Sequence, residues 1–151
     1  MNKLFINKYI LLLIRIFLAF IFIYAGIEKI SDPAAFSDAI SNYKLLPLHF
    51  VNIFAIILPW TELVAGILLL FGILVQENSF ILSSLIIIFL IAIGISLIRG
   101  LNIDCGCFGT SAGSEIGLLK LGENLFLVVL GFILMKYNSD YLTITSSKKI
   151  G

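Results

Sequence analysis

Residues 9–27 read YILLLIRIFLAFIFIYAGI, a run of nineteen residues whose one charged member is Arg15. A helix needs about 20 mostly apolar residues to cross a hydrocarbon core about 30 Å thick, because each residue rises about 1.5 Å. Backbone groups inside lipid must find partners within their own segment, and the run lacks the apolar–polar alternation of membrane barrels. The run therefore predicts a membrane-spanning helix. We expect it to be retained rather than removed as a signal peptide, because no A-x-A-like cleavage site follows it.

Three further apolar stretches of similar length follow, at residues 50–75, 79–98 and 116–137. The chain of 151 residues is 60% hydrophobic and 13% charged, whereas soluble domains average about 45–50% and about 25%. Its net charge of +1 offers no basic surface to phosphate backbones, so we expect no nucleic-acid partner. The sequence predicts an all-α integral membrane protein of the lipid bilayer. We expect a single four-transmembrane-helix bundle over residues 1–151, with a polar tail at 138–151.

The link between the first two predicted spans is long enough for a short helix of its own. Asp32 and Pro33 are typical of a helix start, in which a capping side chain stands ahead of a proline. Residues 34–43 then place three side chains on one face, namely Phe36, Ile40 and Tyr43. We expect this stretch to be an amphipathic interfacial helix that lies on the membrane surface between helices one and two.

Basic residues near the ends of the spans decide the predicted orientation. An even number of spans puts both termini on one side, where five lysines lie: Lys3, Lys8, Lys136, Lys148 and Lys149. Four basic residues lie on the other side: Lys29, Lys44, Arg99 and Lys120. Because cytoplasmic loops carry the excess of basic residues, we expect a multi-pass protein of the inner (plasma) membrane with cytoplasmic N- and C-termini. Both long links then face the extracytoplasmic space.

Cys105 and Cys107 are the two cysteines of the chain, separated by Gly106 alone. A disulfide across one residue closes a small ring whose strain makes it easier to reduce, and it restricts little of the unfolded chain. Strained, exposed bridges are typical of labile or catalytic pairs, so redox chemistry competes here with a structural bridge or inert thiols. Metal binding is a third alternative. His49 is the sole histidine, which disfavours a zinc site, whereas copper(I) could use both thiolates.

Two carboxylates are expected close to the cysteines at the outer face. Glu28 lies near the outer end of the first span, and Asp104 directly precedes Cys105. A carboxylate beside a thiol raises its pKa or relays its proton, so both carboxylates join Cys105 and Cys107 as candidate catalytic residues. For Glu28, an interfacial charge in water is the alternative interpretation.

Charges inside a span are costly, so each one suggests either tight pairing or a function. Arg15 lies about 9 Å into the first span, and Glu62 lies about 12 Å from the same face in the antiparallel second span. We therefore expect Arg15 and Glu62 to pair, either as structural glue or as a proton relay or quinone head-group site.

Trp60 follows Pro59, and a proline inside a helix frees a carbonyl and can open a cavity. We expect Trp60 to line such a cavity or simply to pack. Arg15, Glu62 and Trp60 are thus the predicted cofactor-binding residues, with a membrane quinone as the cofactor.

Several short motifs occur in an order that is typical of one known family. YAGIEKI at residues 24–30 follows Arg15 and precedes Asp32-Pro33, and YKLLP at 43–47, LPWTEL at 58–63 and DCGCFG at 104–109 come after it. With this ordered set the chain resembles the MauE branch of the DoxX-like membrane proteins, which are small four-helix bundles. The resemblance implies a redox-associated protein that handles disulfides during maturation of methylamine dehydrogenase, alongside a thioredoxin-like partner.

The single cysteine pair limits the mechanism, because thiol exchange across a membrane needs a second dithiol on the far side. We therefore predict local exchange at the outer face, in which a thioredoxin-like extracytoplasmic partner forms a mixed disulfide with Cys105 or Cys107. A membrane quinone or a second protein would be the other electron carrier, which would make the chain a thiol–disulfide or quinone-linked oxidoreductase. Two alternatives stay open: a non-enzymatic membrane subunit or docking scaffold with a structural disulfide, and a copper(I)-handling membrane protein.

Overall fold

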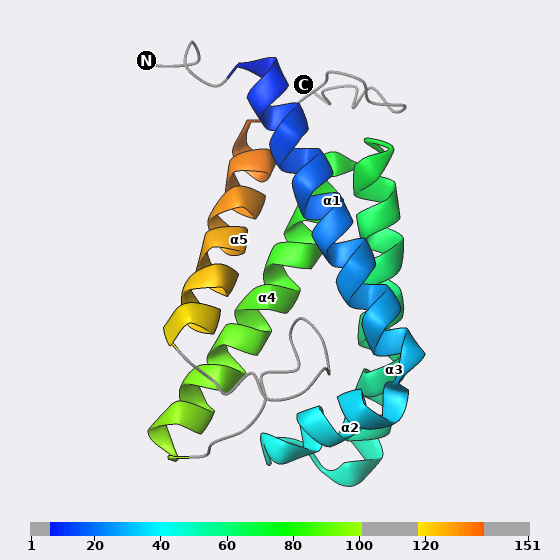
Figure 1. The fold of residues 1–151 in the computed structure, drawn as a ribbon, viewed down its shortest axis with the longest axis vertical. Helices are drawn as coiled ribbons and strands as arrows, with labels where there is room; N and C mark the ends of the chain where they lie inside the picture. Colours follow the sequence, from blue (N-terminus) through cyan, green and yellow to red (C-terminus); the bar gives the residue numbers. More distant parts are fainter. Residues whose placement is uncertain (1–6, 101–117, 138–151) are drawn as a thin grey trace.

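The computed structural model describes residues 7–100 and 118–137, and every regular element in these two ranges is an α-helix. In chain order the helices are α1 (Lys8–Ser31), α2 (Pro33–Asn42), α3 (Leu48–Leu70), α4 (Val75–Ile98) and α5 (Leu118–Lys136), as Figure 1 shows. The all-α prediction is therefore confirmed for the described part of the chain.

The boundary between α3 and α4 differs from the predicted one. The predicted spans 50–75 and 79–98 leave residues 76–78 between them, but the turn lies instead between Leu70 and Val75, so α3 is shorter and α4 begins earlier. Gly72 has φ 70°, a left-handed conformation that glycine adopts without a Cβ clash and that commonly ends a helix. Long apolar side chains continue through this turn, which is why hydropathy alone placed the boundary too late.

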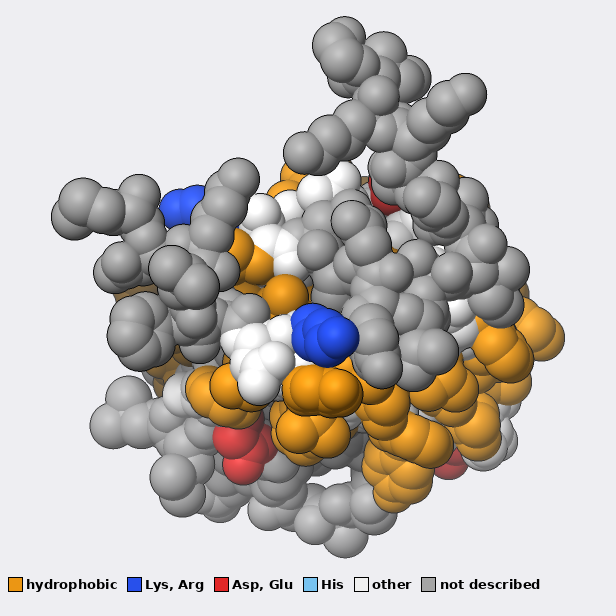
Figure 2. All heavy atoms as spheres, turned by 90° about the horizontal axis from the view of Figure 1, so that it is seen from above, with side chains coloured by type: hydrophobic (Ala, Val, Ile, Leu, Met, Phe, Trp, Pro, Cys, Tyr) orange, Lys and Arg blue, Asp and Glu red, His pale blue; other side chains and the backbone are white. Residues whose placement is uncertain are grey.

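Three of the helices are long and apolar enough to cross a membrane, namely α1, α3 and α4. Their side chains agree with that environment, because large hydrophobic residues are exposed along them, from Phe17 on α1 to Ile88 on α4. Figure 2 views the molecule from the end at which α1 begins and α5 finishes, and hydrophobic side chains gather along one side of it, at the lower right of the picture. An apolar exterior of this extent fits lipid rather than water, and the protein is a membrane protein.

The long helices run alongside one another, and α2 lies across one end of them (Figure 1). At this end α1 and α4 finish, and α3 and α5 begin. We call it the α2 end. The opposite end, where α1 begins and α5 finishes, is the terminal end. Both described residues that flank the segment 101–117 lie at the α2 end, because Gly100 follows α4 and Leu118 opens α5.

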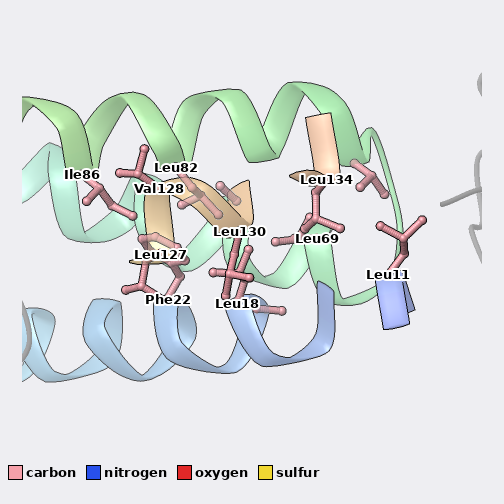
Figure 3. Packing of buried hydrophobic residues seen from close by; sticks show 13 residues of the cluster. Leu11, Leu18, Phe22, Leu69, Leu82, Ile86, Leu127, Val128, Leu130 and Leu134 are labelled. Atoms are coloured by element: carbon pink, nitrogen blue, oxygen red, sulfur yellow. The ribbon is translucent and has the colours of Figure 1, made fainter. Parts of the chain in front are cut away.

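Helix packing is most extensive between α1 and α3 and between α4 and α5. On α1 the buried side chains recur every three or four residues, which gives one stripe facing the core. Leu18 and Phe22 of this stripe meet Leu127 and Leu130 of α5, together with Leu69 of α3, in the main hydrophobic cluster (Figure 3). A second, smaller cluster joins α2 to α3 at the α2 end, through Phe36, Ile40, Val51 and Ala55.

Candidate functional site

A buried ion pair joins α1 to α3 near the α2 end. The Lys29 Nζ donates to Glu62 Oε1 at 2.9 Å and to Oε2 at 2.8 Å. The two side chains are 1% and 4% exposed. Charges buried inside a membrane bundle are tolerated when they pair, and such pairs often mark functional positions. The pair can therefore serve as a structural link between the helices or as a buried group that binds and releases a proton.

Two aromatic rings enclose the Lys29 ammonium from the other helices of this end. The ring centroid of Phe36 on α2 lies 5.2 Å from Nζ, and that of Phe89 on α4 lies 5.3 Å from it. The rings also approach each other, with centroids 6.4 Å apart. A cation within about 6 Å of an aromatic face is attracted by its negative quadrupole. Four helices thus converge on one charged group.

A close contact between the backbones of α1 and α3 determines which residues of the two helices face each other at the ion pair. A Cβ placed on Gly26 would lie 3.0 Å from both Leu63 N and Pro59 O, so only glycine lets the two backbones approach this far. Lys29 stands about one turn beyond Gly26, in the last turn of α1, where a cation also faces the negative end of the helix dipole.

The start of α2 directs Phe36 toward the ion pair. Asp32 Oδ1 accepts a hydrogen bond from Ala35 N at 3.0 Å, and Pro33 occupies the first turn. This is the helix start predicted from the sequence. The predicted face is also found: Phe36, Ile40 and Tyr43 are buried together, against α3 and α4. Burial raises the pKa of Tyr43 to about 12, because the phenolate would lose its hydration.

The expected pair between Arg15 and Glu62 is wrong. Both carboxylate oxygens of Glu62 are bound to Lys29, and Arg15 lies fourteen residues away along α1, about 21 Å. The depth argument assumed that the ends of the two helices are level, but α3 extends past α1 at the α2 end. Gly26 is five residues from the end of α1 yet lies against Pro59, eleven residues into α3. The first turns of α3 pack against α2 instead.

The other predicted site residues are found in different surroundings. Arg15 is 2% exposed, in the half of α1 toward the terminal end. Trp60 is 54% exposed and lines an open groove between α3 and α4, on another side of α3 from Glu62. Glu28 is half-buried near the end of α1. Asp104, Cys105 and Cys107 lie outside the described residues, so their catalytic roles stay predictions, as does cofactor binding by Arg15, Glu62 and Trp60.

Lys29 as the partner of Glu62 was missed in the sequence, although a signal was present. Arg15 and Lys29 are both members of the buried stripe of α1, which recurs at spacings of three and four residues. Either cation was therefore a candidate for Glu62. The choice between them depends on the register of α3 against α1, which no local pattern reveals.

Comparisons with known proteins give the family. The family model described as "Methylamine utilisation protein MauE" matches residues 7–137. The chain is 31% identical over 120 residues to "Methylamine utilization protein MauE" of Methylorubrum extorquens, which covers 79% of this chain and 64% of the relative. The protein of the same name from Methylophilus methylotrophus is 35% identical, over 74% of this chain and 60% of its own.

A longer relative is also similar. "Protein TlpB" of Flavobacterium psychrophilum is 29% identical over 146 residues, which covers 89% of this chain and 39% of that protein. No solved structure matches the chain. The chain matches a little under two thirds of the length of the Methylorubrum extorquens protein, so that relative contains further residues outside the matched part. Because the family match extends over all five helices, the chain belongs to the MauE family of membrane proteins.

Proposed function

We propose that this protein exchanges thiols and disulfides through Cys105 and Cys107 with a thioredoxin-like extracytoplasmic partner. The reaction would serve disulfide handling or the maturation of extracytoplasmic proteins in methylamine utilisation, the process in the names of its MauE relatives. One observation carries the proposal: the buried Lys29–Glu62 pair, with its two rings, ties four helices together at the end from which the cysteine segment departs and to which it returns.

The position of the cysteines in the sequence supports this assignment. Cys105 is five residues beyond Gly100, the last described residue after α4, and Cys107 is two residues further. The same segment leads to Leu118 at the start of α5, at the same end. The segment that carries the cysteines follows α4, one of the four helices that meet at the ion pair, so the residues before it belong to a packed part of the molecule, which favours recognition of a partner.

In the proposed exchange, the electrons and protons that the partner loses are taken up by this protein, and no other reactant is needed. A thiolate of the reduced partner attacks one sulfur of the Cys105–Cys107 disulfide and forms a mixed disulfide, and the other cysteine leaves as a thiolate. The second thiol of the partner then attacks the mixed disulfide and releases the reduced pair. Two electrons move from the partner to this protein, and two protons follow them. The reverse exchange uses the same steps.

Repeated turnover needs a second electron carrier, because the sequence contains two cysteines and both belong to one pair. We propose a membrane quinone in that role. Oxidation of the dithiol to a disulfide releases two electrons and two protons, and reduction of a quinone to a quinol takes up the same number.

We also propose the full topology. In this arrangement α5 is the fourth span, α2 lies at the level of the membrane interface, and both termini are cytoplasmic in the inner membrane. The basic residues near the span ends support it by the positive-inside rule. Single cysteines placed at Gln76 and Ser41 of a cysteine-free variant test it with a membrane-impermeant maleimide. We expect the reagent, added from the extracytoplasmic side, to label Ser41→Cys and not Gln76→Cys. Labelling of Gln76→Cys from that side would overturn the topology.

Trapping of the mixed disulfide tests the proposed exchange. Cys105→Ser and Cys107→Ser are each expressed with a thioredoxin-like partner that lacks its own resolving cysteine. We expect at least one single variant to give a covalent complex whose disulfide dithiothreitol cleaves, and the double variant to give none. Absence of a complex from both single variants would overturn the proposal. Full maturation activity of the double variant would instead favour a docking scaffold.

A further inference from the structure

An apolar pocket of about 350 Å³ lies beside the buried ion pair, among α2, the connection after it, α3 and α4. Its size falls at the low end of about 300–1,000 Å³ for small-molecule sites. Among the described residues that line it, none is charged and Tyr43 is the one that carries a hydroxyl group. A water-soluble, charged ligand would find little to replace its hydration there, so the chemistry of the lining favours an apolar molecule with few polar atoms.

The pocket opens toward the lipid-facing surface. Ile88 and Ile91 on α4 are 62% and 58% exposed, and Leu46 before α3 is 42% exposed. The opposite wall is closed by buried groups, because Tyr43 is 4% and Ile40 8% exposed. Since α3 and α4 are long and apolar enough to cross a membrane, a mouth on their exposed faces is reached from the bilayer. The ligand would enter sideways, as a membrane-dissolved molecule does.

The inner part of the pocket shares a side chain with the ion pair. Phe89 lines the pocket, and its ring centroid lies 5.3 Å from the Lys29 Nζ. Leu58 lines it as well, one turn before Glu62 on α3. A flat ring bound at this wall could stack on Phe89, with the paired ammonium and carboxylate behind that ring. An acyl chain can also pack against this apolar wall, but it has no ring to stack on Phe89.

We infer that this pocket binds the ring of a membrane quinone, with the tail passing out between Leu46 and Ile88 into the bilayer. The inference rests on the proposed function, which requires a second two-electron carrier, and it assigns that carrier a place. This site differs from the one predicted from Arg15, Glu62 and Trp60, because none of these three residues is among the described residues that line the pocket. Tyr43, which is 4% exposed, belongs to the closed wall against which the ring would lie.

Photolabelling tests the pocket directly. The full-length protein is placed in phosphatidylcholine vesicles with an azido-benzoquinone that carries a decyl tail, and the labelled peptides are identified by mass spectrometry. We expect the label within residues 40–46 or 85–92, and we expect excess unmodified decyl benzoquinone to prevent it. Labels found only elsewhere in the chain would overturn the inference. Equal protection by decylbenzene, which has the tail but no quinone, would show a site for lipid chains and would also overturn it.

A pocket-filling variant adds a quantitative measure. Ala92→Phe adds a ring inside the pocket, and Val129→Phe adds the same ring on an exposed face of α5 as a matched control. We expect Ala92→Phe to weaken quinone binding at least about tenfold and Val129→Phe to leave it unchanged. Unchanged binding in a folded Ala92→Phe protein would contradict the inference. If Ala92→Phe does not fold, Ile88→Trp at the exposed mouth replaces it, with the same expected and contradicting results.

The two proposals fail separately. Loss of quinone labelling with an intact mixed disulfide would remove the pocket and leave the thiol exchange in place. Pocket labelling without any mixed disulfide would leave the quinone site standing and remove the exchange reaction.

Discussion

The contact between α1 and α3 and the contact between α4 and α5 are both close, yet they are built differently. At the first, Gly26 lies against backbone atoms of α3, and a buried ion pair with two aromatic rings stands about one turn away. At the second, Gly131 faces the Ser83 side chain, beside the apolar cluster of Leu127 and Leu130. The difference indicates that the α2 end is held by a buried charge interaction. The described contact between α4 and α5 combines apolar packing with a hydrogen bond that Gln76 Nε2 donates to Met135 O at 3.0 Å.

Loss of the carboxylate should have the largest effect. Glu62→Leu leaves the Lys29 ammonium buried without a counter-charge, which costs about 3–5 kcal/mol in buried pairs. We expect that loss in the free energy of unfolding, measured by titration with sodium dodecyl sulfate in mixed micelles. Glu77→Leu is the control, because Glu77 is exposed and surface changes usually stay within about 0.5 kcal/mol. Equal effects of the two variants would refute the distinction between the contacts.

A methyl group between α1 and α3 should have the next largest effect. Gly26→Ala would place its Cβ 3.0 Å from Leu63 N and Pro59 O, and backbone atoms cannot rotate away. Overpacking of this kind costs about 1–3 kcal/mol. The same unfolding titration measures it. A stability equal to wild type would mean that the two helices can separate without strain, so the contact would not set the level of the ion pair.

The buried phenol of Tyr43 should make the α2 end sensitive to alkali. Its folded pKa of about 12 lies above the ordinary value of 10.0, so the unfolded chain loses the proton first. The stabilising contribution is complete below pH 10 and is lost as the pH rises toward 12. We expect the melting temperature to fall over this interval, and Tyr43→Phe to fall less. Parallel pH profiles of the two proteins would contradict burial of the phenol.

Gly131→Ala should have the smallest effect. Its Cβ would meet the Ser83 Oγ, the end of a side chain that can rotate, and the remaining contacts are ordinary. Alanine also gains helix propensity, about 0.5–1 kcal/mol over glycine, which offsets the rotation. We expect a change below about 1 kcal/mol. Gly94→Ala meets nothing within 4 Å and reports the propensity gain alone. A loss as large as that of Gly26→Ala would show that the two contacts are equally rigid.

Much of the fold was readable in the sequence, because length and hydropathy determine a spanning helix without reference to its neighbours. The helices α1 and α4, the Asp32–Pro33 start of α2 and the buried face of Phe36, Ile40 and Tyr43 all depend on local patterns. The turn at Gly72 was the exception. Its neighbours are apolar, so hydropathy did not reveal the turn, which depends on the left-handed φ of Gly72.

The partner of Glu62 was not readable in the same way. It depends on how far α3 extends past α1, and the packing of Val51 and Ala55 against α2 sets that register. Depth counted from the predicted ends of the spans put Arg15 level with Glu62, although Lys29 lay on the same stripe of α1. Arrangements that depend on contacts between distant segments need the structure, even when each segment is predicted correctly.

A double-mutant cycle on the two cations tests the central claim most directly. Unfolding free energies are compared for Lys29→Met, Arg15→Met, Glu62→Leu and the two double variants with Glu62→Leu. For Lys29 and Glu62 we expect a coupling energy at or above the upper end of the about 0.5–3 kcal/mol that is usual for residues in contact, because each single variant leaves one buried charge unpaired and the double variant regains most of the stability lost by Glu62→Leu. For Arg15 and Glu62 we expect additive losses. Strong coupling of Glu62 to Arg15, with none to Lys29, would contradict the account.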